Sequence, residues 1–457
     1  MTLSNGEQEH GVIITHGIGD QKRGDTIAEF SKAVYDSLIK SPKDNEPPMI
    51  LLEPDISGNP SSVTLKITSP YGDKATWRCQ EAHWNDAFPP PNATQVLWWG
   101  LNQNLRKQLS SIIKIMTDPT NKSLPTKNER QKEDLKKKRG EKTGAVELNG
   151  TLKGQVVFKS GVMSGIVLIL LTPLAYVLLF IIWLLHFIPS IGPLDKIINW
   201  IRKLDPFLSS SIGDIKRLVD HEIWAANAKK RLEDIVLNML NDSDIKDITI
   251  VAHSLGAVLA YEALTEGSRI AKAIEESGDS ISKKITLVSV GGAINRVFAL
   301  IAQKGYEHLQ INKPLAKVIT HYRDDAYKGR LQDKFYWLDI FARKDPISAG
   351  PIDQDIIEKK ARIHPLDQMK ERMVINKDSL IFDHNSYWGN MELVMPRITR
   401  AINGGEEYPW PEAGITEKKV TERIQKALKF DNLSQKIMLL TLLGLIVFLC
   451  LKLTGTI

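Results

Sequence analysis

Residues 248–264 join an apolar strand pattern to a helical pattern with almost no room for a loop. The segment reads ITIVAHSLGAVLAYEAL, and its β-type run ends at His253 and Ser254 just before the helical pattern begins. Ala252 and Gly256 supply small residues where a strand and a helix would cross. The Ser254 hydroxyl would then lie above the carboxyl edge of a sheet, where parallel sheets bind ligands. An ordinary serine N-cap, the alternative, would not require this surrounding pattern.

Short β-type runs alternate with helical patterns along much of the chain. This alternation predicts an α/β fold in which helices cover both faces of a mostly parallel sheet. We expect strands at residues 11–17, 62–68, 248–254, 285–292, 316–323 and 335–343. We expect helices at residues 26–40, 212–240 and 257–273.

Cysteine content and charge exclude several classes of protein. Cys79 and Cys450 are too few for a disulfide framework or a cysteine zinc site, which fits a reducing compartment. Most of the net charge of +6 lies in residues 121–143, where nine Lys/Arg face four Asp/Glu. This segment has few apolar residues, so we expect a solvated linker that could approach anionic lipid, and no nucleic-acid partner.

Two apolar runs indicate association with a membrane. Residues 162–188 contain 27 residues without a formal charge, interrupted by Pro173. As a helix they would span about 40 Å, more than the roughly 30 Å hydrocarbon core requires. Residues 437–451 form a shorter run at the C-terminus. The residues at 93–116 add an amphipathic, Trp-containing helical pattern typical of the headgroup layer. A helix of the globular core is the alternative for all three.

The junction at Ser254 resembles the nucleophile elbow of the α/β-hydrolase superfamily, especially of its lipases and esterases. The family pattern is G-x-S-x-G, and this chain has AHSLG, with Ala252 in place of the first glycine. A second similarity is the strand end VIITHG, which finishes at His16 and Gly17. In lipases that look like this, the His-Gly pair shapes the oxyanion hole. The resemblance covers about residues 11–17 and 248–389.

The resemblance implies which groups would stabilise an oxyanion. The residue after His-Gly, here Ile18, would donate its backbone N–H, and Leu255 would donate the second. His16, Gly17 and Gly256 would support this arrangement. A phosphate-binding loop is the alternative for this turn, but no G-x-x-x-x-G-K-[ST] pattern follows it.

The superfamily orders its triad along the chain as serine, acid and histidine. Asp345 follows the strand pattern FYWLDIFARK and is the expected acid. Alternative acids are Asp339, Asp324 and Asp325.

Two histidines follow the expected acid in the sequence, His364 and His384. His384, in LIFDHNSYWGN, is the expected base because family members often carry a His-Ser-Tyr-Trp-like stretch there. His364, which a proline follows, is the alternative.

We therefore expect a membrane-bound serine hydrolase of lipase or esterase type, acting on acyl esters of lipids or other membrane-associated compounds. Ser254 would attack, His384 would take its proton, and Asp345 would stabilise the imidazolium. We expect no cofactor and no metal ion. An acyltransferase using the same triad and an inactive, membrane-tethered interaction module are the alternatives.

The chain divides into four expected regions. Residues 1–92 would form the first part of the α/β-hydrolase domain, 93–204 a membrane-associating insertion, 205–430 the rest of the domain, and 431–457 a C-terminal anchor. The strands before and after the insertion must join one sheet. We therefore expect a re-entrant hairpin or a one-leaflet insertion, with the catalytic domain on the cytoplasmic face.

Overall fold

The computed structural model describes residues 9–17, 19, 21–39, 49–55, 58–68, 74–87, 177, 214–218, 222–264, 268–277, 283–295, 297, 335–342, 345, 347–348, 352, 369–376, 383–404 and 422. Its strands are β1 (Glu9–Thr15), β2 (Met49–Asp55), β3 (Ser62–Thr68), β4 (Lys74–Glu81), β5 (Ile245–His253), β6 (Ile285–Val290), β7 (Phe335–Ala342) and β8 (Met369–Val374). Its helices are α1 (Asp25–Ile39), α7 (Glu222–Asn241), α8 (Leu255–Ala263), α9 (Arg269–Ser277) and α14 (Met395–Ile402), with short 3-10 helices η1 (Asn85–Ala87) and η6 (Asp383–Asn385).

The strands form one sheet in the order β2-β3-β4-β1-β5-β6-β7-β8. β3 runs antiparallel to both of its neighbours, and the other pairs are parallel. β1 lies between β4 and β5, with Ile14 opposite Glu81 and Thr15 opposite Ala252. The carboxyl ends of these three strands therefore meet at one edge of the sheet, the edge where ligands bind in open α/β sheets.

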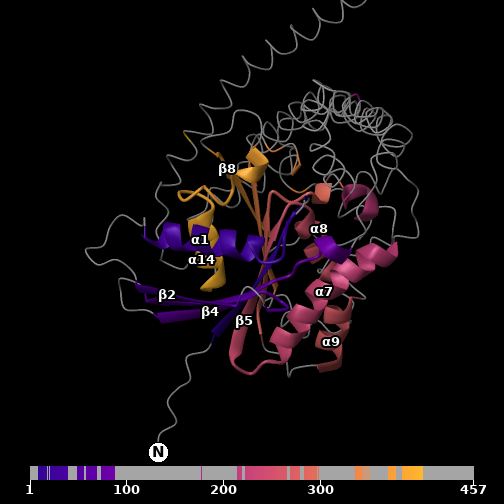
Figure 1. Cartoon of the computed structure of the whole chain (residues 1–457), viewed down its shortest axis with the longest axis horizontal. Coiled ribbons are helices and arrows are strands. Elements are labelled where there is room, and N and C mark those ends of the chain that lie inside the picture. Colours follow the sequence, from indigo (N-terminus) through magenta and orange to yellow (C-terminus); the bar gives the residue numbers. More distant parts are fainter. Residues whose placement is uncertain are drawn as a thin grey trace, which may run out of the picture.

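Helices cover both faces of the sheet, as Figure 1 shows: α1 and α14 lie on one side, and α7, α8 and α9 on the other. Two separate hydrophobic cores result. Phe30 of α1 and Ile398 of α14 belong to one core, and Val236 of α7 and Leu259 of α8 belong to the other. Full burial of one such side chain contributes about 1.5–3 kcal/mol to folding. The expected α/β fold, with a mostly parallel sheet between helical layers, is thereby confirmed.

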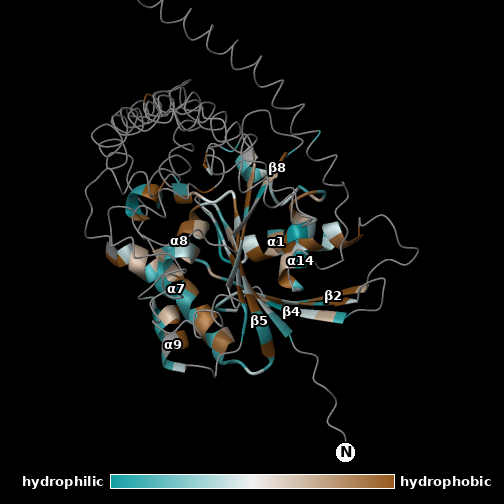
Figure 2. Cartoon of the chain, turned by 180° about the vertical axis from the view of Figure 1, so that it is seen from behind, coloured by the Kyte–Doolittle hydropathy of each residue, from teal (hydrophilic) through white to brown (hydrophobic). Residues whose placement is uncertain are grey.

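Burial patterns follow from the position of each strand. All six residues of β6 are buried, as expected of a central parallel strand that is covered on both faces. β3 instead alternates between buried and more exposed residues. The helices carry both kinds of surface, and Figure 2 shows hydrophobic and hydrophilic residues side by side on α7 and α9.

One expected helix is wrong in its extent. The pattern at 257–273 predicted a single helix, but α8 ends at Ala263 and α9 begins at Arg269. The Ser268 hydroxyl accepts a hydrogen bond from the Ala271 N–H (3.1 Å) and caps the second helix. The expected helix at 212–240 corresponds to helical residues 214–218 and to α7.

Several expected segments lie outside the described residues. They are the strand at 316–323, the insertion up to residue 204 with the exception of Val177, and the C-terminal run at 437–451. In the part of the chain that is described, no helix has the length and apolar character needed to cross a membrane.

The contact between α8 and β1 requires a glycine at position 256. A Cβ there would lie 2.4 Å from the His16 carbonyl oxygen and 2.9 Å from that of Thr15. Because both atoms belong to the backbone, Gly256→Ala should lower the free energy of unfolding by about 2–3 kcal/mol in urea denaturation. At Gly389 the nearest atom to an added Cβ is the Ser386 oxygen, at 3.7 Å. Gly389→Ala should therefore change stability by less than about 0.5 kcal/mol, and equal losses in both variants would contradict the close packing.

Candidate active site

Ser254 occupies a strained turn between β5 and α8. Its backbone has φ 54 and ψ −120, and it is the one non-glycine residue with a positive φ in the described ranges. Such a conformation costs on the order of 1–3 kcal/mol and persists where the surroundings hold it. The Ser254 N–H donates to the Val290 oxygen (3.1 Å), and its carbonyl accepts from the Ala293 N–H (3.0 Å). The end of β6 thus fixes the turn on both sides.

Glycine residues allow the backbone to approach this turn closely. A Cβ on Gly17 would lie 2.6 Å from the Ser254 Cβ and 3.1 Å from its Oγ. The loop after β1 is therefore in direct contact with the serine. This close approach explains the glycine in the His16-Gly17 pair.

Three residues that lie far apart in the sequence meet at this point. His384 Nε2 lies 2.8 Å from the Ser254 Oγ, and His384 Nδ1 lies 2.9 Å from the Asp345 Oδ2. An Nδ1–H that donates to Asp345 leaves Nε2 free to accept the serine proton. All three residues are buried, Ser254 completely. The structure therefore brings together the expected serine, acid and histidine.

The Asp345 carboxylate is surrounded by hydrogen-bond donors. Oδ1 accepts from the N–H groups of Ile347 (2.7 Å) and Ser348 (3.2 Å), and Oδ2 accepts from the Tyr387 hydroxyl (2.7 Å) as well as from His384. Burial alone would raise the pKa of Asp345, but His384, Tyr387 and the Ile347 N–H together hold it below its usual range. The group is therefore ionised at neutral pH and can stabilise an imidazolium.

Tyr387 is a residue of the site to which the sequence assigned no role. Its hydroxyl donates to Asp345 and accepts a hydrogen bond from the Ala342 N–H at the end of β7 (2.7 Å). Gly291, with φ +57, makes room for both groups, since a Cβ there would lie 2.5 Å from the Tyr387 ring and 2.8 Å from the Asp345 Oδ2. The motif HNSYW contained Tyr387, but its partner lies 42 positions away.

His253 contacts both the ring and the backbone of His384. Its ring stacks on that of His384 with centroids 4.9 Å apart, and its Nε2–H donates to the His384 carbonyl oxygen (3.1 Å). Burial, together with the neighbouring His384, lowers the pKa of His253 to about 3. His253 is therefore neutral and holds the loop that carries His384.

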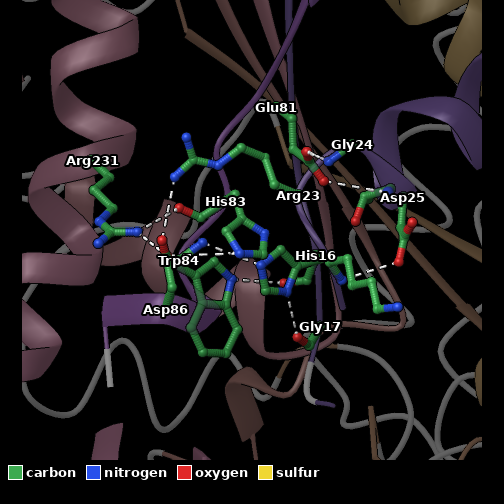
Figure 3. A network of polar contacts seen from close by, with 12 residues as sticks. His16, Gly17, Arg23, Gly24, Asp25, Glu81, His83, Trp84, Asp86 and Arg231 are labelled. Atoms are coloured by element: carbon green, nitrogen blue, oxygen red, sulfur yellow. Dashed lines mark hydrogen bonds and ion pairs between the residues drawn. The ribbon is translucent and has the colours of Figure 1, made fainter. Parts of the chain in front are cut away.

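His16 has a corresponding role in the loop after β1. Its Nδ1–H donates to the Gly17 oxygen (2.8 Å), and its Nε2 accepts from the Trp84 N–H (3.2 Å). The Trp84 indole stacks on the ring and donates to the His16 carbonyl (3.0 Å), as Figure 3 shows. Burial lowers the pKa of His16 to about 3, so the ring stays neutral and supports the loop. The sequence marked His16 but not Trp84, which follows a strand that was not expected.

Of the two expected oxyanion donors, Leu255 is among the described residues and Ile18 is not. Leu255 is the first residue of α8 and is buried, and an N–H at that position has no acceptor within its own helix. It also lies at the positive end of the helix dipole. Ile18 lies outside the described residues, but its neighbours Gly17 and Gly19 are described.

A cluster of ion pairs borders this loop. Asp86, which follows β4, pairs with Arg23 (3.3 Å) and with Arg231 of α7. Arg231 also donates to the His83 carbonyl (3.3 Å; Figure 3). These charges are partly exposed, and such pairs contribute at most about 1 kcal/mol each. They connect α7 with the segment that carries Trp84.

The alternative site residues are not part of this arrangement. Asp339 is buried within β7 and accepts a hydrogen bond from the Ser289 hydroxyl of β6 (2.6 Å). Asp324, Asp325 and His364 lie outside the described residues. Among the residues that are described, no group of three or more His, Cys, Asp or Glu side chains could hold a metal ion.

Neither a scan against protein-family models nor searches of curated proteins and of solved structures found a match to this chain.

Removing the Tyr387 hydroxyl should change both the acid and the stability of the protein. In Tyr387→Phe, Asp345 loses a hydrogen-bond donor, so its pKa should rise. The side-chain carboxyl carbon signal of Asp345, followed by NMR, should therefore titrate at higher pH in the variant than in the wild-type protein. The Ala342 N–H also loses its acceptor, which should cost about 1–3 kcal/mol in urea denaturation. Tyr35→Phe, on the surface of α1, is the control, and an unchanged titration of Asp345 in Tyr387→Phe would refute this role.

Proposed function

We propose that the protein is a serine hydrolase of lipase or esterase type, with a catalytic domain of the α/β-hydrolase fold. The observation that carries the proposal is His384, whose two ring nitrogens lie within hydrogen-bond distance of the Ser254 hydroxyl and the Asp345 carboxylate. The serine lies on a strained strand-to-helix turn, as a nucleophile elbow requires. The order serine, aspartate, histidine along the chain also agrees with this superfamily.

The geometry is suited to acyl transfer through a covalent intermediate. Ser254 Oγ attacks the ester carbonyl while its proton passes to His384 Nε2, and the charge of Asp345 stabilises the imidazolium. The N–H groups of Leu255 and Ile18 bind the developing oxyanion. His384 then protonates the leaving alcohol, and the serine remains acylated. Water, deprotonated by His384, releases the acid and restores the serine.

The substrate class follows from the apolar segments of the sequence. The run at 162–188 and the C-terminal run at 437–451 favour a domain held at a membrane, where lipid and other acyl esters are concentrated. We propose that the site acts on such esters from the cytoplasmic face. The chemistry of the triad requires neither a cofactor nor a metal ion.

Labelling with a fluorophosphonate probe tests the nucleophile. The wild-type protein should be labelled, Ser254→Ala should not be labelled, and His384→Ala should react at least about 100-fold more slowly because the base is absent. Ser277→Ala, which removes a hydroxyl at the end of α9, should be labelled like the wild type. Labelling that persists in Ser254→Ala would move the nucleophile elsewhere. No labelling of any form would favour an inactive interaction module.

Replacing the acid by its amide tests the role of Asp345. In Asp345→Asn the side-chain amide can donate to His384 Nδ1, which would place the histidine proton on Nε2, facing the serine. The kcat for a soluble nitrophenyl ester should fall by roughly 10⁴-fold. Asp234→Asn, which weakens two exposed ion pairs, with Lys230 and with Arg269, should leave kcat unchanged. A loss of less than tenfold in Asp345→Asn would show that another group orients the histidine.

A further inference from the structure

The loop between β1 and α1 is held at both of its ends, by the last residue of β4 and by a residue that follows this strand. At its start, His16 is fixed by its two hydrogen bonds with Trp84. At its end, Glu81 accepts hydrogen bonds from the N–H groups of Gly24 and Thr26. These contacts, shown in part in Figure 3, determine where the loop leaves the sheet and where it enters α1. These hydrogen bonds do not fix the middle of the loop, which begins at Gly17 next to Ser254.

A carboxylate from a distant segment binds the middle of the loop. The Gly19 N–H donates to the Asp214 Oδ2 at 3.1 Å, across 195 positions of sequence. Asp214 also forms a salt bridge through its Oδ1 with Arg217 Nη1 at 3.0 Å. The Asp214 side chain is fully buried and that of Arg217 is 5% exposed. The backbone at Gly19 has φ +124, a conformation that is open to glycine and rarely to other residues.

This hydrogen bond lies one residue from the expected oxyanion donor. Gly17 is in contact with Ser254, and Gly19 is bound to Asp214, so the described residues before and after position 18 are both held in place. A peptide N–H can point in a defined direction only when its neighbours are fixed, and glycines do not restrict their own backbone. Preorganised donors stabilise an oxyanion because they need no reorientation during the reaction. The anchor at Gly19 therefore has a direct consequence for the chemistry at Ser254.

We propose that Asp214 is a positioning residue for the oxyanion hole, an inference that rests on the proposed hydrolase function. Its carboxylate holds Gly19, the residue that follows the proposed donor Ile18, and thereby fixes this part of the loop. Arg217 neutralises the buried carboxylate and keeps it aimed at the loop. Trp84 and Asp214 also lie on either side of the region 93–204 in the sequence. The loop is thus held by the chain before and the chain after that region.

Two matched double variants separate positioning from stability. Removing one partner of a buried ion pair leaves an unpaired charge, whereas replacing both by groups of similar volume is often tolerated. Asp214→Asn/Arg217→Met keeps an oxygen that can accept from Gly19. Asp214→Leu/Arg217→Met has a similar branched shape but offers no acceptor. The two proteins therefore differ in the hydrogen bond to Gly19.

We expect the variant with leucine to show a kcat for a soluble nitrophenyl ester that is roughly 10- to 100-fold below that of the variant with asparagine. KM should differ by less than about threefold, and the melting temperatures should agree within a few degrees. Affinity for a trifluoromethyl ketone, which forms a tetrahedral adduct with the serine, should fall by the same factor as kcat/KM. The pH profile should keep its shape, because Asp345 and His384 are intact.

Equal kcat values in the two double variants, or a loss in kcat matched by a loss in melting temperature, would overturn the role of Asp214. A wild-type protein that neither turns over esters nor reacts with a fluorophosphonate would overturn the proposed function, and this role with it. A second measurement needs no variant. The Gly19 amide of the wild-type protein should exchange its hydrogen slowly, and exchange at the rate of an exposed amide would also overturn the proposal.

Discussion

The backbone turn at Ser254 is the constraint on which the rest of the site depends. A non-glycine residue with φ 54 is held there by hydrogen bonds to Val290 and Ala293, at the end of the neighbouring strand. β5 and α8 are both packed into the core, so neither element can move to relieve the strain. Gly256 and Gly17 then allow the first strand and its loop to approach the turn. The serine hydroxyl thereby acquires a fixed position at the edge of the sheet.

His16, His253 and His384, three of the histidines near this edge, differ because their surroundings differ. Among the described residues, no carboxylate is hydrogen-bonded to the ring of His16 or His253. Burial lowers the pKa of each to about 3, and each neutral ring holds a loop. His384 instead has a carboxylate on one side of its ring and a hydroxyl on the other. The donors around Asp345 keep that carboxylate ionised despite burial. The environment thus leaves one of the three rings suited to proton transfer.

Much of the fold could be predicted from local patterns, and the exceptions have physical reasons. β2, β4 and β8 were not expected. β2 is largely exposed and contains Pro54, which a position at the edge of the sheet tolerates, so it lacks the apolar alternation of a covered strand. β8, MKERMV, has three charged residues among six, and β4 places Arg78 and Gln80 between buried residues. The break between α8 and α9 falls at residues 265–268, where TEGS has no apolar side chain and contains Gly267, a signal that the expected helix at 257–273 ignored.

By itself, the sequence determined the α/β class and the strand–serine–helix junction, because these depend on patterns within a few residues of one another. The resemblance to the α/β-hydrolase superfamily then marked Asp345 and His384 as candidates. The tertiary structure alone decided how the site is held. Tyr387 and its carboxylate partner are 42 positions apart, Trp84 and its histidine partner 68, and Asp214 and its glycine partner 195. Nothing local distinguishes these three side chains from ordinary buried residues. Their roles arise because the order of strands in the sheet brings their segments to one edge.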